Sequence, residues 1–534
     1  MATGPQTSGV DDELANGASR DWWQRIDDWC ERIGDAVNPI LVKETRQALK
    51  SRQFVATFSL LLFAALAWTI AGSLMMMPQI YTSPSAPRML IGYYIVLAIP
   101  LLLIVPLAAY RSLEIEIDDG TLELLSITAL SPWQIVLGKL ASATLQMVLY
   151  FVALLPCVAY AYTLRGVDLP TTFLMVGILV VAAMLLTIVA LFFAPLARGR
   201  TGRIANLLVV LLILVISEYA VGALVIFMLL EGNPLPADVA VFLFVATIFL
   251  SVCIGHLLLT ATAAQLTPET ENRSTPIRLS LLALTAVAIG LAAYALQMED
   301  DDIAMGTLLF FSIGLAIVWM VSGSMMVAES STMTPRIRRD LPSSFLARST
   351  LTWLTPGPAT GLVFTTTVVL LCSVLFLVGF EVLSEKHGNG IGGVNRLRVL
   401  LHQWTVLYAG YTIGFLVFVR LIVAVVRLKS NPRVEIGIAT FVVVAVMAAL
   451  VPYAIAMHFN DYRSFEYSRW QITNWAWTFG EAGGRRLSQG DEDFVATGAA
   501  ILFAICLVAM PGTVLPRKIA TPKRVQEEKA KRSY

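Results

Sequence analysis

Long apolar runs, separated by short polar breaks, occupy the chain from residue 54 to residue 514. A helix that crosses a membrane needs about 20 mostly apolar residues. By this criterion the pattern predicts about twelve spans. Their expected ranges are 54–77, 89–109, 140–163, 171–196, 204–230, 238–262, 279–296, 303–327, 361–383, 400–426, 436–459 and 494–514. We therefore expect an all-α polytopic membrane protein.

The distribution of Lys and Arg over the polar breaks predicts the orientation of these spans. Cytosolic loops of helical membrane proteins carry an excess of both residues. If the N-terminus is cytosolic, the basic segments 43–52, 198–203, 336–348 and 427–433 all lie inside, as does the tail from 517. An even number of spans then places the C-terminus inside as well. We expect a multi-pass protein of a bacterial-type inner (plasma) membrane with both termini cytoplasmic.

Composition shifts suggest five regions. Residues 1–20 are polar and lack the basic and apolar parts of a signal peptide, so they are expected to form a disordered cytosolic tail. An amphipathic region covers 21–53, one six-span unit covers 54–262, and a second six-span half covers 263–514. Residues 515–534 form a basic cytosolic tail.

The segment before the first span has helical periodicity. Trp22, Ile26, Trp29, Ile33 and Val37 recur every three or four residues opposite a charged face, which predicts an amphipathic helix. A second helix is expected to begin at the following proline, because proline suits the first helical position. The tryptophans favour an elbow helix that lies in the plane of the cytosolic leaflet. An ordinary juxtamembrane anchor is the alternative.

The loop after the second span has an ordered sequence pattern, RSLEIEIDDGTLELLSITALSPWQIVLGK. Asp118, Asp119 and Gly120 predict a turn, and 121–128 predict a short helix. Ser131 and Gln134 predict a capping box at the start of the third span. The loop is acidic, against the basic trend of the inside segments. A solvated loop is one interpretation, and a docking element for a cytosolic partner is the other.

These two segments together resemble the ABC-2 family of ABC-transporter permeases. The resemblance lies in NPILVKE before the first span and in E-x-x-x-G-T-L-E-L-L-x-x-T-x-L-S-P-W-x-I-V-L-G-K, which runs from Glu116 to Lys139. It covers about the first 260 residues. The residues 263–534 hold no second copy of the motif, and their one sizeable inside segment, 336–361, is basic and proline-rich.

The resemblance implies a permease subunit, an exporter, whose coupling helix around 120–128 docks on a separate ABC-type ATPase. ATP and magnesium would then bind to that partner, and this chain would not be an enzyme. A homodimer or a second permease is a further candidate partner, beside the lipid bilayer. The residues that the resemblance assigns to docking are Glu116, Asp119, Gly120, Thr121, Leu122, Glu123 and Leu125.

Composition narrows the function classes. The chain has 534 residues, of which 57% are hydrophobic and 14% charged, with a net charge of +1. Soluble domains carry about 25% charge, so an ordinary soluble enzyme, a disordered protein and a nucleic-acid binder are excluded. The sequence has no GxxxxGK[ST] motif, no CxxC pair and no zinc spacing of histidines. We expect no metal or cofactor in this chain.

Three ionisable residues inside predicted spans are candidates for a transport pathway, because such residues are costly in a membrane. Glu218 lies near the middle of the fifth span, and His256 in the sixth is expected to be an interior histidine. Arg420 is close enough to the inside end of the tenth span to snorkel. A stand-alone secondary transporter with Glu218 as a proton or ion site is the alternative function. A membrane-embedded enzyme would require Glu218 and His256 to meet in a hydrated cavity.

Overall fold

The structure is a computed structural model that describes most of the chain. The described residues are 39–78, 83–120, 131–164, 166, 169–196, 199–231, 237–268, 271–298, 301–330, 334–341, 344, 351–386, 392–430, 433–461, 466–484, 489–509 and 519. Within these ranges the regular structure consists of helices and contains no strand.

Twelve of the described helices are long and apolar enough to cross a membrane. This confirms the predicted fold class, an all-α polytopic membrane protein. The second span is the continuous run α5 (Ala86–Ala98), η2 (Ile99–Ile104) and α6 (Val105–Asp118). The other spans lie in α4 (Arg52–Met75), α8 (Pro132–Thr163), α9 (Leu169–Phe193), α10 (Arg200–Glu231), α11 (Ala237–Leu266), α12 (Ser274–Ala295), α13 (Asp301–Val327), α16 (Pro358–Lys386), α17 (Gly392–Val426), α18 (Ile436–Phe459) and α20 (Gln489–Ala509).

The chain divides into two compact units. Unit 1 comprises Met1–Phe244 and Ile254–Leu266, and unit 2 comprises Val245–Cys253 and Thr267–Tyr534. The helix α11 contributes to both. The expected boundary between the two six-span halves lies at 262/263, close to the end of the second segment of unit 1.

Several helix ends follow local sequence rules. The helix α3 (Pro39–Lys50) begins at the predicted proline. Ser131 and Gln134 form the predicted capping box, in which the Ser131 side chain accepts from the Gln134 backbone N–H and the Gln134 side chain accepts from the Ser131 backbone N–H. Asp119 ends α6, and Gly120 follows with φ of 66°, a left-handed conformation that glycine adopts without a steric penalty. The two ends of the loop after the second span are therefore set by the residues that predicted them.

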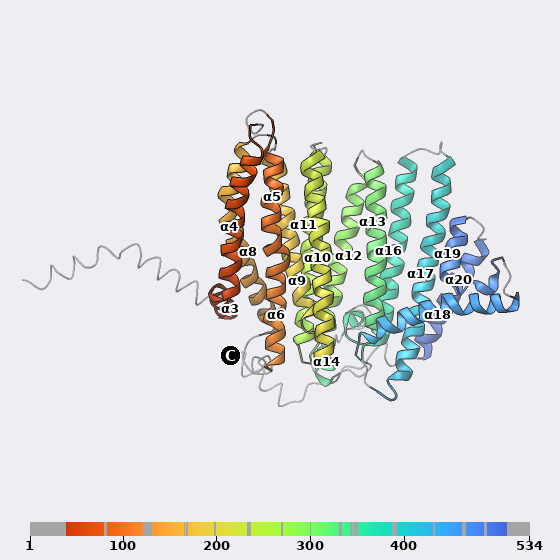
Figure 1. Cartoon of the computed structure of the whole chain (residues 1–534). Coiled ribbons are helices and arrows are strands. Elements are labelled where there is room, and N and C mark those ends of the chain that lie inside the picture. The colour runs from red at the N-terminus through yellow and green to blue at the C-terminus, as the bar shows by residue number, and fades with distance from the viewer. Residues whose placement is uncertain are drawn as a thin grey trace, which may run out of the picture. The chain divides into compact units, whose positions relative to one another are not determined.

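In unit 1 the second span lies at the centre of the packing. Its middle turn, η2, is a π-helix that contains Pro100, and Pro106 follows in the first turn of α6. Residues of this span, among them Tyr93, Leu102, Tyr110 and Leu113, form the buried core with α8, α9 and α10. Figure 1 shows α4, α5 and α8 running side by side, with α3 at one end of α4. The buried core along the second span thus extends close to the residue at which the following loop begins.

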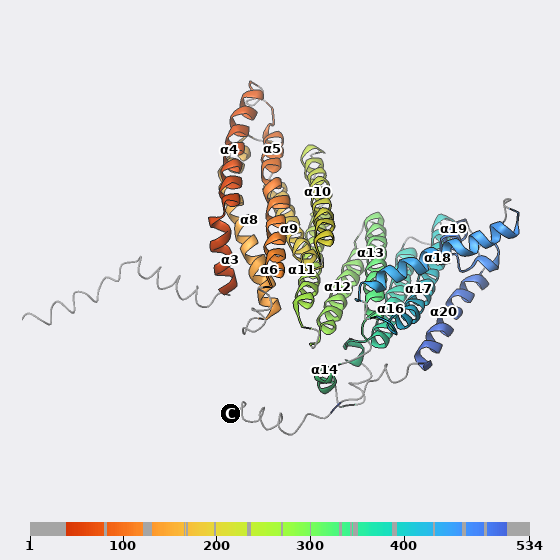
Figure 2. The same cartoon turned by 60° about the horizontal axis from the view of Figure 1, so that its bottom comes forward.

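In unit 2 the main packing joins α13 to α16 and α17 to α20. The short helix α19 (Trp475–Gly484) lies between the last two spans in the sequence and packs against α17 and α18. Both views show α18 set at a steep angle to α13 and α16 (Figures 1 and 2). Of the 24 residues of α18, only Gly437 is buried. A Cβ atom at this position would lie 2.1 Å from the Ser324 carbonyl oxygen, so α13 and α18 meet where no side chain fits.

Several expectations concern residues outside the described ranges. These are the tail 1–20, the amphipathic helix 22–37, the short helix 121–128 and most of the basic tail 515–534. Among the expected docking residues, Glu116, Asp119 and Gly120 are described, whereas Thr121, Leu122, Glu123 and Leu125 are not.

Candidate functional site

A buried lysine joins three helices at the base of the loop after the second span. Lys139, in the second turn of α8, has a side chain that is 1% exposed. Its Nζ lies 3.2 Å from Glu44 Oε1 on α3 and 3.0 Å from Glu116 Oε2 on α6. It also donates to Ser112 Oγ at 2.7 Å. We call Lys139, Glu44, Glu116 and Ser112 the Lys139 cluster.

The hydroxyl of Ser112 closes the Lys139 cluster. It accepts from Lys139 and donates to Glu44 Oε2 at 3.1 Å. Lys139 Nζ also donates to the Ser112 carbonyl at 3.4 Å, so its hydrogen bonds go to Glu44 Oε1 and to two oxygens of Ser112, and the ion pair with Glu116 adds a second carboxylate. Because a buried charge is tolerated only when it is paired and hydrogen-bonded, this set of partners explains how an otherwise apolar helix holds a lysine at this depth.

Additional basic residues offset the acidic end of α6. Carboxylates at a helix C-terminus face the negative end of the helix dipole, so Glu116 and Asp118 need cations nearby. Lys43 Nζ of α3 lies 3.6 Å from Glu116 Oε1. Arg203, near the start of α10, forms an ion pair with Asp118. Two of the acidic side chains at this end of α6 are thus paired with cations from neighbouring helices.

The start of α10 is tied to the same region by hydrogen bonds. Asn206 Nδ2 donates to Tyr110 Oη at 3.1 Å and to the Phe193 carbonyl at 2.7 Å. Tyr110 is fully buried on α6, and Phe193 ends α9. The helices α3, α6, α8, α9 and α10 are therefore connected by polar contacts at one end of unit 1.

This arrangement can transmit force. Both ends of the loop, at Glu116 and Lys139, are held in the same ion cluster, and the cluster also holds α3. A push or pull on the loop would therefore act on the three helices together.

The pathway candidate Glu218 lies beside a buried tyrosine. It is half-buried on α10 and interacts electrostatically with Tyr94 of α5. The Tyr94 hydroxyl is buried and has no hydrogen-bond partner among the described residues. It lies against Gly222, one turn beyond Glu218. Glu218 and the Tyr94 hydroxyl thus lie in the same region of unit 1, within its spans, with no hydrogen bond from Tyr94 to Glu218.

The structure corrects two interpretations of the ionisable residues. His256 is not an interior side chain: it is exposed on α11, and its ring lies 5.6 Å from that of Trp133 at the start of α8. Arg420 does not snorkel, because it is buried on α17, only 4% exposed, close to Cys506 of α20. Snorkelling was inferred from the distance to the helix end, and the packing of α20 against α17 removes the route to the surface.

A second buried cation, in unit 2, was not expected from the sequence. Arg278 of α12 is fully buried, and its Nη2 lies 2.8 Å from Glu329 Oε2, just beyond the end of α13. Its guanidinium also donates to the carbonyls of Trp353, Thr355 and Gly357. We call this set the Arg278 cluster. A signal was available, because Arg278 lies within the first turns of an apolar helix, but the predicted span began only at residue 279 and left Arg278 outside it.

The described residues include no group of three or more His, Cys, Asp or Glu side chains that could hold a metal ion. The clustered charges of unit 1 are instead a lysine and two glutamates in mutual contact. The Lys139 cluster is therefore a set of ion pairs and hydrogen bonds.

No protein-family model, curated protein or solved structure matches the chain.

Proposed function

We propose that this chain is the membrane-spanning permease subunit of an exporter that resembles the ABC-2 type. A separate ABC-type ATPase would dock on the loop around residues 110–138 and supply the ATP and magnesium. The chain would lie in a bacterial-type inner membrane with both termini in the cytoplasm.

The contact of Lys139 with Glu44 and Glu116 is the observation that carries this proposal. The resemblance was assigned from two separate stretches of sequence, NPILVKE and the segment from Glu116 to Lys139. Glu44 belongs to the first stretch, whereas Glu116 and Lys139 begin and end the second. In the fold, these residues meet around one ammonium group. This convergence supports an interpretation in which the two stretches work as one mechanical element.

The mechanism would use the Lys139 cluster as a rigid joint. When ATP draws the partner's nucleotide-binding subunits together, the loop moves with the surface on which it docks. Because the ends of the loop are held to α3, α6 and α8, the motion passes to the spans of unit 1. The buried ion pairs make this transfer stiff, since separating them within the protein costs several kcal/mol per ion.

Co-purification from native membranes tests this proposal. The tagged full chain is compared with Gly120→Pro, with Glu123→Lys and with the control Glu435→Lys, which reverses an exposed charge in another expected inside loop. We expect a P-loop ATPase to co-purify with the wild type and with Glu435→Lys, and to be lost from the two loop variants. Recovery of no ATPase under gentle solubilisation, or equal recovery with all four chains, would refute the proposal.

A second function, secondary transport, is favoured by the position of Glu218 within a span, in the region of the buried Tyr94 hydroxyl. A carboxylate beside a buried hydroxyl without a partner is a reasonable site for a proton in transit. In liposomes that contain only this chain, a proton flux that Glu218→Gln abolishes would favour secondary transport. A flux that is absent without the ATPase would favour the permease.

A further inference from the structure

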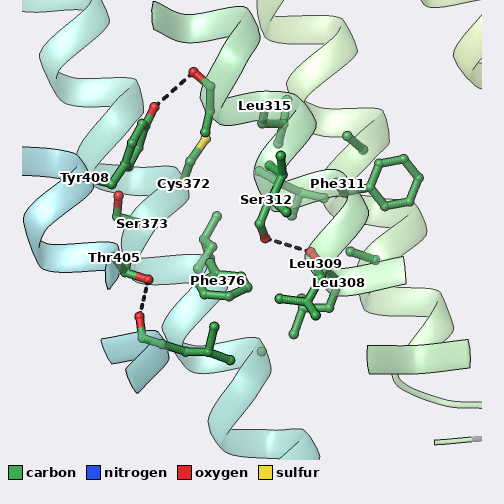
Figure 3. A pocket seen from close by; sticks show the side chains of 18 of the residues that line it. Leu308, Leu309, Phe311, Ser312, Leu315, Cys372, Ser373, Phe376, Thr405 and Tyr408 are labelled. Atoms are coloured by element: carbon green, nitrogen blue, oxygen red, sulfur yellow. Dashed lines mark hydrogen bonds between the residues drawn. The ribbon is translucent and has the colours of Figure 1, made fainter. Parts of the chain in front are cut away.

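A largely apolar cavity of about 500 Å³ lies within unit 2, apart from the Lys139 cluster. It is formed between α13, α16 and α17, with the end of α12 and one residue of α19 (Figure 3). Its volume falls within the range of about 300–1,000 Å³ that is typical of sites for small ligands. Binding of a ligand in this cavity would not require the proposed docking of an ATPase.

The polar side chains that line the cavity are mostly satisfied by the protein itself. Ser312 donates to the Leu308 carbonyl at 2.7 Å, Thr405 to the Leu401 carbonyl at 2.7 Å, and Tyr408 to the Ala316 carbonyl at 3.2 Å (Figure 3). Ser373 Oγ is buried and has no partner among the described residues. The surface of the cavity is therefore mostly apolar, and the Ser373 hydroxyl is the one group among those named here that is left to bind a polar ligand.

The entrance of the cavity lies on an apolar surface of the kind that contacts the acyl chains of lipids. Three of its lining residues, Ile313, Ile317 and Val378, are each more than half exposed. They lie in helices that are long and apolar enough to span the membrane. Because exposed apolar side chains of such helices contact lipid, the entrance is reached from the bilayer rather than from water.

The cavity extends from the middle of the spans toward one end, and polar and aromatic groups lie at that end. Its lining residues are in the middle of α13, the first half of α17, and the second halves of α12 and α16. Arg398 and Glu381 form an ion pair there, with Nε 2.7 Å from Oε1. Trp404 and Phe479 of α19 lie edge to face at 6.3 Å beside the cavity. An apolar interior below a polar and aromatic rim matches a molecule with a hydrocarbon tail and a polar head.

We propose that this cavity binds one acyl chain of a membrane phospholipid, with the head group at the level of the Arg398–Glu381 pair. A water-soluble ligand would leave its polar groups unpaired against the apolar lining, which is costly. An acyl chain has no polar groups to leave unpaired, so it avoids this cost. It reaches the entrance by diffusing within the bilayer.

Photo-crosslinking of the full chain in lipid nanodiscs tests this inference. The probe is a phosphatidylglycerol that carries a diazirine in the middle of one acyl chain, and the labelled peptides are identified by mass spectrometry. We expect adducts to concentrate on 308–320 of α13 and 369–382 of α16, and to decline at least fivefold when unlabelled phosphatidylglycerol is added in tenfold excess over the probe.

Two variants fill the cavity, and one serves as a matched control. Ser312→Phe places a ring in the cavity, and Ser373→Leu fills it while removing the hydroxyl that has no partner. Gly314→Phe adds the same ring to an exposed position of α13 that does not line the cavity. We expect both filling variants to lower labelling at least fivefold and the control to preserve it.

Labelling spread evenly over the exposed apolar residues of all spans would overturn the inference, because it would indicate ordinary annular lipid. Undiminished labelling of the correctly folded Ser373→Leu chain would also overturn it. Monodisperse elution and an unchanged unfolding midpoint establish that each variant is folded.

Discussion

Each unit contains a buried cation beside the loop that follows its second span, but the two cations are bound in different ways. Lys139 in unit 1 is bound by side chains, namely two carboxylates and a hydroxyl from other helices. Arg278 in unit 2 is bound mainly by the backbone, through three carbonyls of the loop around 353–357. Glu329 completes that arrangement by accepting from the Gly357 N–H at 2.7 Å and from Ser274 Oγ at 2.7 Å.

The difference follows from the chemistry of the two cations. A lysine ammonium is a compact charge on a flexible stem, whereas an arginine guanidinium is a planar fork with fixed donor directions. The ammonium of Lys139 can therefore pair with groups that approach it from different helices. The Arg278 cluster fixes the conformation of one loop. A buried charge thus joins helices to one another in unit 1, whereas in unit 2 it fixes the conformation of a loop.

The largest effect is expected from Arg278→Met. It removes the guanidinium from three carbonyls and takes away the cation that pairs with the Glu329 carboxylate, which should cost about 5 kcal/mol, the upper end for breaking a buried pair. We expect low yield and a strongly lowered unfolding midpoint in detergent. Arg278→Lys should recover little of this loss, because an ammonium cannot reproduce the fork. A rescue by lysine equal to the wild type would remove the distinction between the two clusters.

A smaller effect is expected from Lys139→Met, about 3 kcal/mol, because Glu44 and Glu116 are partly exposed and can rehydrate. The loss comes from two carboxylates left without their shared cation. The double variant Lys139→Met/Glu116→Gln should therefore be more stable than the single variant. Unfolding midpoints of the two purified variants measure this difference, and a double variant no more stable than the single one would contradict the ion-pair account.

The smallest effects are expected from two matched serine substitutions. A hydrogen bond to a charged group contributes about 1.5–3 kcal/mol. Ser112→Ala removes a hydroxyl that bridges Lys139 and Glu44, so we expect a loss of about 2 kcal/mol. Ser274→Ala removes a single bond to Glu329, which Arg278 and Gly357 still hold, and about 1 kcal/mol is expected. Thermal unfolding of both variants in the same detergent ranks them, and the reverse order would show that the hydroxyl of unit 1 is dispensable.

The features that the sequence predicts are those that depend on residues close together in the chain. The spans follow from long apolar runs, and the ends of the loop after the second span follow from Gly120 and Ser131, whose effects act over a few residues. The contacts that define the Lys139 cluster were not predicted. Glu44 and Lys139 are 95 residues apart, and only the packing of α3 against α8 brings them together.

The same reasoning explains the errors at Arg420 and His256. Both were interpreted from their position along one helix, as if the helix had no neighbours. Arg420 is buried because α20 packs against α17, and His256 is exposed because of the side of α11 on which it lies. Position along a helix predicts depth in the membrane, but burial depends on which face meets another helix.

The close approach at Gly437 has a consequence for how the sequence of α18 can change over generations. The other residues of this helix are not buried, so one apolar side chain can replace another there at little cost. At Gly437 even one added methyl group would collide with the backbone of α13. Natural variation along α18 should therefore be broad, with a single invariant glycine that marks where the helix is anchored.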